Sequence, residues 1–106
     1  MTTLTGMGQR ALGAVPALAE ITDRVLFGEV WERDTLCKRD RSLVTVACLI
    51  ALCRDGQLPF HLQTALDNGV TRAELGEVVT HLAFYAGWPA AATAARLLGD
   101  VPTTPR

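Results

Sequence analysis

Apolar residues recur three and four positions apart along most of this 106-residue chain, and Pro and Gly fall at the borders of the periodic stretches. That spacing is the period of an α-helix, in which residues three or four apart share one face. No stretch alternates apolar and polar residues as a half-buried strand does. The pattern therefore predicts an all-α protein of about five helices.

The expected helices are bounded by ordinary start and stop residues. The first begins at Pro16 and runs to Trp31, with Leu18, Ile21 and Val25 on one face. The second, over about 40–54, follows the charged segment 33–41 and is apolar on nearly every side, so it is expected to be central or to lie in a subunit contact. The third begins at Pro59 and stops at Asn68-Gly69, and the fourth and fifth cover 71–86 and 89–98.

The fourth helix has the clearest local signal in the chain. Thr71 and Glu74 form a Thr-x-x-Glu capping box, in which each side chain bonds the backbone N–H of the other residue. Val70 and Leu75 occupy the flanking positions of a hydrophobic staple. The alanine-rich fifth helix is expected to allow close approach of a neighbouring helix.

Length and apolar content together predict how the chain is organised. We expect one domain over 1–106, because this length suits one core and no second one, with a frayed tail at 101–106. Hydrophobic residues make up 49% of the chain, a large share for so small a monomer, so we expect a homo-oligomer.

Charge and segment lengths exclude some classes of partner. A net charge of −1 offers no basic field for nucleic acid. The longest nearly apolar run, 43–53, is too short for the roughly 20 residues that span a bilayer. No export signal is visible, so we expect a cytoplasmic protein whose three cysteines, Cys37, Cys48 and Cys53, are reduced. Cys48 and Cys53 are expected to be small buried hydrophobic residues.

Four blocks of sequence, in order and with matching spacing, resemble the carboxymuconolactone decarboxylase family, which also includes the alkylhydroperoxidase D-like (AhpD-like) thiol reductases. The resemblance covers about 27–96. The blocks are Gly28-Glu-Val-Trp31, Arg39-Asp-Arg-Ser-Leu-Val-Thr-Val-Ala47, Leu58-x-x-His61 with Ala65-Leu-Asp-Asn-Gly69, and Glu77-x-x-x-His81 leading into Tyr85-Ala-Gly-Trp-Pro89. The resemblance implies a compact helical fold and assembly as trimers or hexamers.

The thiol-reductase branch of that family fits this sequence poorly. Counted back from His61, the Cys-x-x-Cys pair of that branch would stand at Arg54 and Gln57, and its glutamate at Ser42. Cys48 and Cys53 are five residues apart, about 140° around a helix, so they point in different directions. A peroxide or disulfide reductase remains an alternative, as does a noncatalytic oligomer that binds a small ligand.

The decarboxylase branch implies a lyase of aromatic catabolism that acts on a small carboxylated lactone or a related enolisable acid. Carbon dioxide would leave a carbon conjugated to the lactone carbonyl, and the electron pair would delocalise onto oxygen as a dienolate. Neither a cofactor nor a metal is needed for that step. The site must bind carboxylate, donate a hydrogen bond to the developing oxyanion and protonate carbon.

Histidines and a carboxylate are the candidates for the chemical step. The family match favours His61 as proton donor or dienolate stabiliser, although a lone histidine at the edge of an apolar stripe is ordinarily structural. Glu77 precedes His81 by one helical turn, where it can orient and charge the imidazole. An exposed ion pair beside two boundary aromatic residues explains Glu77 and His81 equally well.

Arginines that begin the second helix are the candidates for binding carboxylate. The guanidinium groups of Arg39 and Arg41 offer a bidentate fork, although a solvated run of charge is also plausible there. The remaining expected substrate-binding residues are Glu29, Trp31, Gln57, Tyr85 and Trp88. No metal site is expected, because the two histidines lack a defined ligand set and no cysteine stands at zinc spacing.

Overall fold

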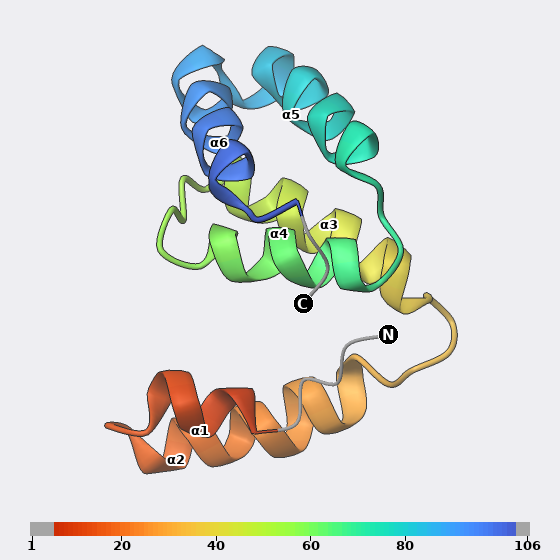
Figure 1. Ribbon diagram of the computed structural model, residues 1–106. Helices are drawn as coiled ribbons and strands as arrows, with labels where there is room; N and C mark the ends of the chain where they lie inside the picture. Colours follow the sequence, from red (N-terminus) through yellow and green to blue (C-terminus); the bar gives the residue numbers. More distant parts are fainter. Residues whose placement is uncertain (1–5, 104–106) are drawn as a thin grey trace. The chain divides into compact units, whose positions relative to one another are not determined.

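The computed structural model describes residues 6–103, and over that range the chain consists of helices and connecting turns (Figure 1). The predicted all-α class is confirmed for this part of the chain. Two compact units divide the sequence, residues 1–38 and 39–106. Each unit is described by itself below, and the expectation of one domain over 1–106 stays a prediction.

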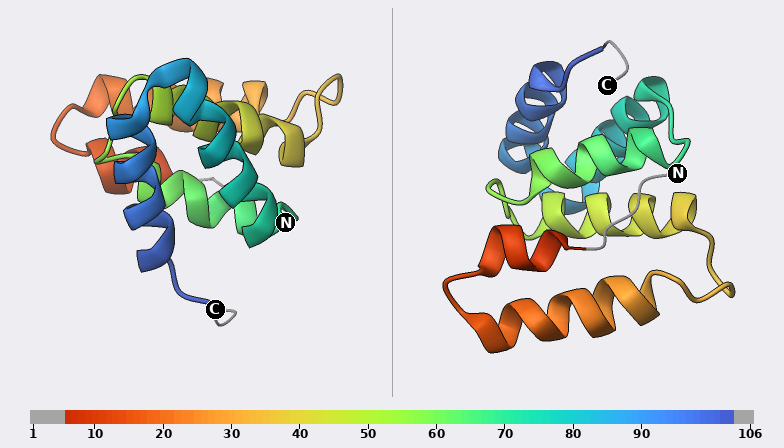
Figure 2. Two further views of the ribbon diagram at one scale, coloured as in Figure 1. Left: turned by 90° about the horizontal axis from the view of Figure 1, so that it is seen from above. Right: turned by 60° about the horizontal axis from the view of Figure 1, so that its bottom comes forward.

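The first unit is a helical hairpin. Helix α1 spans Met7–Leu12, α2 spans Pro16–Ile21, and a π-helix, η1, continues directly from α2 over Thr22–Val30 (Figure 2). The predicted helix over 16–31 therefore exists, but its second half is wound more widely than an α-helix. Asp23 joins the two arms, because its carboxylate accepts hydrogen bonds from the backbone N–H groups of Gly8 at 2.6 Å and Gln9 at 3.0 Å.

Close approach in this hairpin requires a glycine. A Cβ atom on Gly8 would lie 2.8 Å from the carbonyl oxygen of Ala19. Among the described residues of this unit only Gly8, Ala19 and Trp31 are buried. Leu18 and Ile21, expected on a packed face, are 48% and 49% exposed.

Four helices form the second unit. They are α3 over Lys38–Ala51, α4 over Leu58–Asp67, α5 over Arg72–Ala86 and α6 over Trp88–Asp100. Each lies within three residues of its predicted range at both ends. Helices α5 and α6 form an antiparallel hairpin, and α6 also contacts α4 (Figure 1).

Small side chains form the contact between α5 and α6. Ala83 of α5 and Ala90, Ala91 and Ala94 of α6 are buried, as the expectation of close helix approach requires. These alanines pack inside their own unit, so they are not the apolar surface that an oligomer would need. The larger members of the same core are Val46, Ile50, Leu58, Leu62, Val70, Leu75, Val79 and Val101.

Hydrogen bonds stabilise the start of α5 and the end of α6. The predicted capping box is confirmed: Thr71 Oγ1 accepts from Glu74 N at 3.0 Å, and Glu74 Oε1 accepts from Thr71 N at 2.9 Å. One residue later, the Arg72 guanidinium donates to the carbonyl oxygens of Leu98 and Val101, both at 2.8 Å, and of Pro102 at 3.1 Å. Val101 is buried, whereas residues 104–106 of the tail expected to fray lie outside the described residues.

A buried polar pair joins α3 to the end of α4. Asn68 Nδ2 donates to Ser42 Oγ at 3.1 Å, and both side chains are buried. Ser42 is at the position of the glutamate expected in the thiol-reductase branch. In this chain its side chain forms a buried hydrogen bond with Asn68 instead.

Two further expectations concern membranes and thiols. Within residues 6–103 no helix has the length and apolar character that crossing a bilayer requires. The expected burial of Cys48 and Cys53 is wrong, because both are exposed, as is Cys37. Cys37 lies in the turn before α3, and the other two lie on or just after the last turn of α3, where a side chain is not covered by the core.

Candidate functional site

An open groove lies between α3 and α5 in the second unit. It encloses about 520 Å³ and has mostly apolar walls. Its lining residues are Leu43, Val44 and Ala47 of α3 and Glu74, Glu77, Val78, His81 and Leu82 of α5. We call this surface the α3–α5 groove. A small planar ligand fits such a volume, because ordinary small-molecule sites range from about 300 to 1,000 Å³.

Glu77 and His81 bring ionisable groups into the α3–α5 groove. Both side chains are exposed and stand one helical turn apart on α5, the arrangement expected from the sequence. The imidazole of His81 stacks on the ring of Tyr85, with centroids 4.8 Å apart and an angle of 29° between the planes. The Tyr85 ring therefore covers one face of the His81 imidazole. His81 also lines the groove between α5 and α3.

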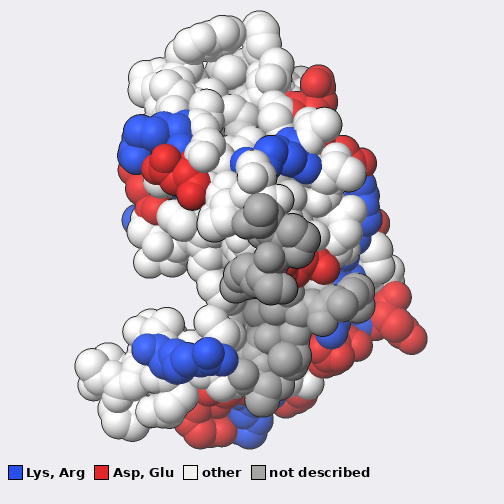
Figure 3. All heavy atoms as spheres, in the orientation of Figure 1, with Lys and Arg blue, Asp and Glu red and all other residues white. Residues whose placement is uncertain are grey.

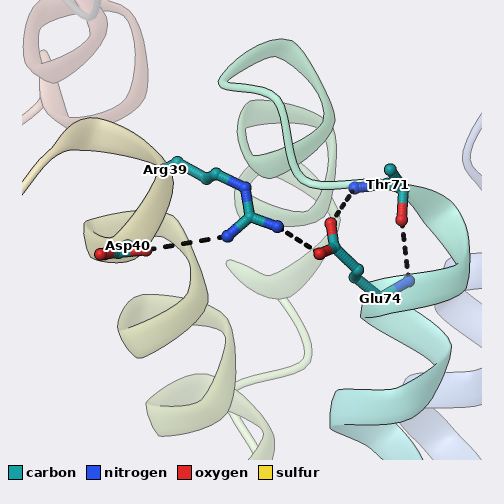
Figure 4. A network of polar contacts seen from close by, with 4 residues as sticks. All are labelled: Arg39, Asp40, Thr71 and Glu74. Carbon is teal, nitrogen blue, oxygen red and sulfur yellow. Dashed lines mark hydrogen bonds and ion pairs between the residues drawn. The ribbon is translucent and has the colours of Figure 1, made fainter.

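Glu74 also lines the groove, but its carboxylate is already occupied. It accepts the capping-box hydrogen bond from Thr71 and forms an ion pair and hydrogen bond with Arg39 of α3 (Figure 4). The Thr71 hydrogen bond and then the Arg39 hydrogen bond lower the pKa of the Glu74 carboxyl below its usual 4.5. Glu74 is thus ionised at neutral pH and ties the start of α5 to the start of α3.

The two candidate arginines differ in their surroundings. The Arg39 guanidinium is held by Glu74 and lies 3.7 Å from Asp40 Oδ1, so two carboxylates already balance its charge (Figure 4). Arg41 lies two residues further along α3 and is half-buried. Its carbonyl oxygen accepts a hydrogen bond from Thr45 Oγ1 at 2.7 Å. Both arginines stay candidates for binding an external carboxylate, and the charge of Arg39 is already balanced by Glu74 and Asp40.

His61 lies apart from these residues, in the first half of α4. It is half-buried, its ring meets Phe60 edge-on at 4.9 Å, and it is not one of the residues that line the α3–α5 groove. Burial lowers the pKa of His61 below its ordinary 6.5. The ring is therefore neutral near pH 7 and offers one N–H donor and one acceptor nitrogen.

The remaining predicted site residues fall in three places. Gln57 is exposed immediately before α4, where its carbonyl oxygen accepts from the His61 backbone N–H at 3.4 Å. Trp88 begins α6 and is exposed, with its ring edge-on to Phe84 at 5.2 Å. Glu29 and Trp31 belong to the first unit, where Glu29 is exposed and Trp31 is buried beside Phe27.

Metal-ligand side chains and thiols are the remaining reactive groups among residues 6–103. That range contains no group of three or more His, Cys, Asp or Glu side chains placed to hold a metal ion. The three cysteines are free thiols.

Sequence reasoning missed the α3 side of the groove and the role of Glu74 in it. The sequence predicts Glu74 in the capping box and on the same flank of its helix as Glu77 and His81, but it does not predict the ion pair with Arg39. The sequence did indicate an apolar surface on α3. A helix that is apolar on nearly every side has more apolar surface than one core can cover.

Comparison with known proteins gives a consistent result. A model of the carboxymuconolactone decarboxylase family matches residues 16–100. The chain is 45% identical over 78 residues to the 4-carboxymuconolactone decarboxylase of Acinetobacter baylyi, an alignment that covers 74% of this chain and 58% of that protein. It is 37% identical over 70 residues to the nitrosuccinic acid decarboxylase of Metarhizium robertsii, covering 66% of this chain and 49% of that protein. The chain thus spans between about half and three fifths of the length of these two relatives.

Proposed function

Because the chain belongs to the carboxymuconolactone decarboxylase family, we propose that it is a cofactor-independent lyase that removes carbon dioxide from a small carboxylated, enolisable acid. The observation that carries this proposal is the family match over 16–100, which includes both histidines, Glu77 and the arginines of α3. A carboxylated lactone is the first substrate to test, since the Acinetobacter relative is named for one.

The two relatives' names share one chemical requirement. In a carboxymuconolactone the electron pair left by carbon dioxide can delocalise toward the lactone carbonyl, and in nitrosuccinic acid it can delocalise onto the nitro group. Both substrates also keep a second acidic group after the reaction. The substrate class proposed here is therefore an acid with an electron-accepting group beside the departing carboxylate and another carboxylate or lactone for binding.

Residue roles follow from the surroundings of each side chain. Breaking the carbon–carboxylate bond releases carbon dioxide and leaves its electron pair on the substrate as an enolate. His61 donates its N–H to that enolate oxygen, then transfers this proton to the carbon that lost carbon dioxide, and takes up a proton from water in return. Arg41 binds the retained carboxylate, because its guanidinium at the start of α3 offers a bidentate fork. In the α3–α5 groove, Glu77 and His81 form a second acid–base pair, and the Arg39 ion pair offsets the charge of Glu74.

Assembly from identical chains is part of the same proposal. Large apolar side chains remain exposed in the second unit, among them Val44 at 61% and Leu52 at 55%. Exposed apolar side chains of this size favour burial against another copy, which supports assembly as a trimer or hexamer.

The test is release of carbon dioxide from 4-carboxymuconolactone and from nitrosuccinic acid by the purified chain. The His61→Gln variant is the matched comparison, because glutamine keeps an N–H donor but cannot transfer a proton. We expect turnover by the parent and a loss of about 10²- to 10⁴-fold in kcat for the variant, with ligand binding retained.

Two results would contradict the proposal. One is a folded parent that releases no carbon dioxide from either acid above the uncatalysed rate, in which case binding without turnover favours the noncatalytic alternative. The other is a His61→Gln variant within about threefold of the parent, far below the expected loss, which would transfer the acid role to His81.

A further inference from the structure

The α3–α5 groove carries a negative charge that no described residue balances. Two carboxylates line the groove, and the charge of Glu74 is offset by the Arg39 guanidinium (Figure 4). Glu77 stands three residues further along α5 and forms no ion pair with any residue in 6–103. Glu77 therefore determines which charge the groove favours in a ligand.

Basic side chains are missing from most of the α5–α6 hairpin. After Arg72, at the start of α5, the sequence has no Lys or Arg until Arg96 in α6. On the face that Figure 3 shows, no basic side chain lies over the end of the unit where α5 meets α6. The α3 side of the groove is aliphatic and consists of Leu43, Val44 and Ala47. The lining of the groove thus includes no Lys or Arg.

His81 supplies a second polar group in the groove. Its imidazole stacks on the Tyr85 ring, with centroids 4.8 Å apart, so one face of the imidazole is covered. Glu77 and His81 both line the groove, one helical turn apart, but they form no ion pair with each other. A carboxylate only accepts hydrogen bonds, and an unprotonated imidazole has one acceptor nitrogen. A donor group that lies between the two side chains can therefore bind both.

These features define the chemistry of a matching ligand. An ammonium group suits the two acceptors, because it has N–H donors for both and a positive charge for Glu77. The aliphatic walls and the volume of about 520 Å³ suit an apolar body such as one ring on a short chain. A carboxylate is disfavoured, because it would lie beside the charge of Glu77 without any Lys or Arg in the lining.

The groups proposed for decarboxylation lie outside this lining. Neither His61, the proposed proton donor, nor Arg41, the proposed carboxylate-binding residue, lines the α3–α5 groove. The carboxylated substrate is an anion, whereas the charge of the groove favours a cation. The groove is therefore suited to a different ligand from the acid that the chain is proposed to decarboxylate.

We propose that the α3–α5 groove binds a small primary amine with an apolar body. The ammonium group donates hydrogen bonds to Glu77 and His81, and the apolar body lies against Val44 and Ala47. Ion pairs at exposed carboxylates are weak, so we expect millimolar affinity and a preference of about three- to tenfold for an amine over an acid with the same body. This site does not depend on the proposed function.

NMR titration of the full chain, at neutral pH and low ionic strength, tests the ligand class. Phenethylamine, phenethyl alcohol and hydrocinnamate share a similar body and have a cationic, a neutral and an anionic head. We expect saturable amide shifts over 43–47 and 77–82, and at least about threefold tighter binding of phenethylamine than of hydrocinnamate. No saturable shift, shifts confined to other segments, or equal binding of amine and acid overturns the proposal.

Charge variants at Glu77 test the ion pair itself. Glu77→Gln keeps the size of the side chain and should weaken phenethylamine binding to the level of phenethyl alcohol. Glu77→Lys reverses the charge and should make hydrocinnamate the tighter ligand. Asp55→Asn and Asp55→Lys are the matched controls, because Asp55 is exposed in the turn between α3 and α4 and does not line the groove. Both controls should keep the preference of the parent, and a Glu77→Lys variant that still prefers the amine contradicts the proposal.

These measurements separate the amine site from the proposed function. A chain that binds phenethylamine in the groove but releases no carbon dioxide refutes the proposed function alone. An active chain whose groove does not prefer the amine refutes the amine site alone.

Discussion

Arg39 and Arg41 show how strongly two like residues on the same helix can differ. Arg39 is held by Glu74 and Asp40, and it joins the first turn of α3 to the first turn of α5 (Figure 4). Because its charge is already balanced, a substrate carboxylate gains little from it. Sequence alone offered both arginines equally, since only tertiary structure brings Glu74 to Arg39.

Substrate affinity should separate the two arginines. We expect Arg41→Ala to raise KM by about 10- to 100-fold, the loss of one hydrogen-bonded charge pair, and to leave kcat less affected. Arg39→Ala should change KM by a smaller factor and lower stability slightly, since partly exposed ion pairs contribute little. Steady-state kinetics on a verified substrate provide the check, and a larger KM effect at Arg39 would reverse the assignment.

His61 should make stability depend on pH. Its pKa is lower in the folded chain than the 6.5 of an exposed histidine, so below about pH 6.5 the unfolded chain takes up a proton that the folded chain does not. The free energy of unfolding must therefore fall as the pH decreases through that window. Urea unfolding at pH 7.5 and 5.5 should show a smaller fall for His61→Gln than for the parent.

The control for that comparison is Thr80→Ala, an exposed change on α5 that leaves both histidines in place. It should keep the pH dependence of the parent. If His61→Gln keeps it as well, His61 is not the group that titrates.

Secondary structure was predictable where local chemistry determines it. The capping box of Thr71 and Glu74 placed the start of α5, and Pro and Gly placed the other helices of the second unit to within three residues. The π-helix η1 and the helix over Met7–Leu12 were not expected, because neither has a comparable local signal. The groove was not expected either, since it depends on how α3 and α5 lie side by side.

At the scale of helices, Arg72 is the residue that fastens α6 to α5. Its guanidinium donates to three carbonyl oxygens at the end of α6 and just beyond it, groups that a helix end otherwise leaves to water. We expect Arg72→Ala to lower the free energy of unfolding by about 1 to 3 kcal/mol. Urea denaturation measures this, and hydrogen exchange should show lost protection in the last turn of α6.

Arg72→Lys is the matched comparison, because an ammonium keeps the charge but not the fork geometry that reaches several carbonyls. An intermediate loss is expected for it. Equal stability of all three proteins would mean that water replaces the arginine without cost.

For the molecule as a whole, cysteine chemistry should be dispensable. Cys37, Cys48 and Cys53 are free and exposed, so replacing all three by serine removes no buried volume. We expect the free energy of unfolding of the triple variant to lie within about 0.5 kcal/mol of that of the parent, the usual range for surface changes. The variant should also retain turnover. Loss of turnover in the folded variant, with a reducible disulfide in the parent, would support the thiol-reductase alternative.

Family membership and the all-α class could be predicted because they depend on the spacing of motifs and on the period of apolar residues, both of which can be read along the sequence. The two units and the exposure of Phe84, Tyr85 and Trp88 were not, because they depend on which apolar residues the fold leaves uncovered. Tyr85 illustrates the point: its place in the motif suggested a boundary residue that lines a pocket, whereas it is 78% exposed and stacks on His81.

In the alanine contact between α5 and α6, substitutions that add volume are expected to be much more damaging than those that remove it. Ala83, Ala90, Ala91 and Ala94 have a single methyl group each, so random substitution there cannot create the large cavities that damage most cores. Nearly every change other than to glycine adds volume and forces the two helices apart, at about 1 to 3 kcal/mol for each added group that cannot be accommodated. During evolution this pair of helices can therefore drift freely on its outer faces, while its inner faces are confined to the smallest side chains.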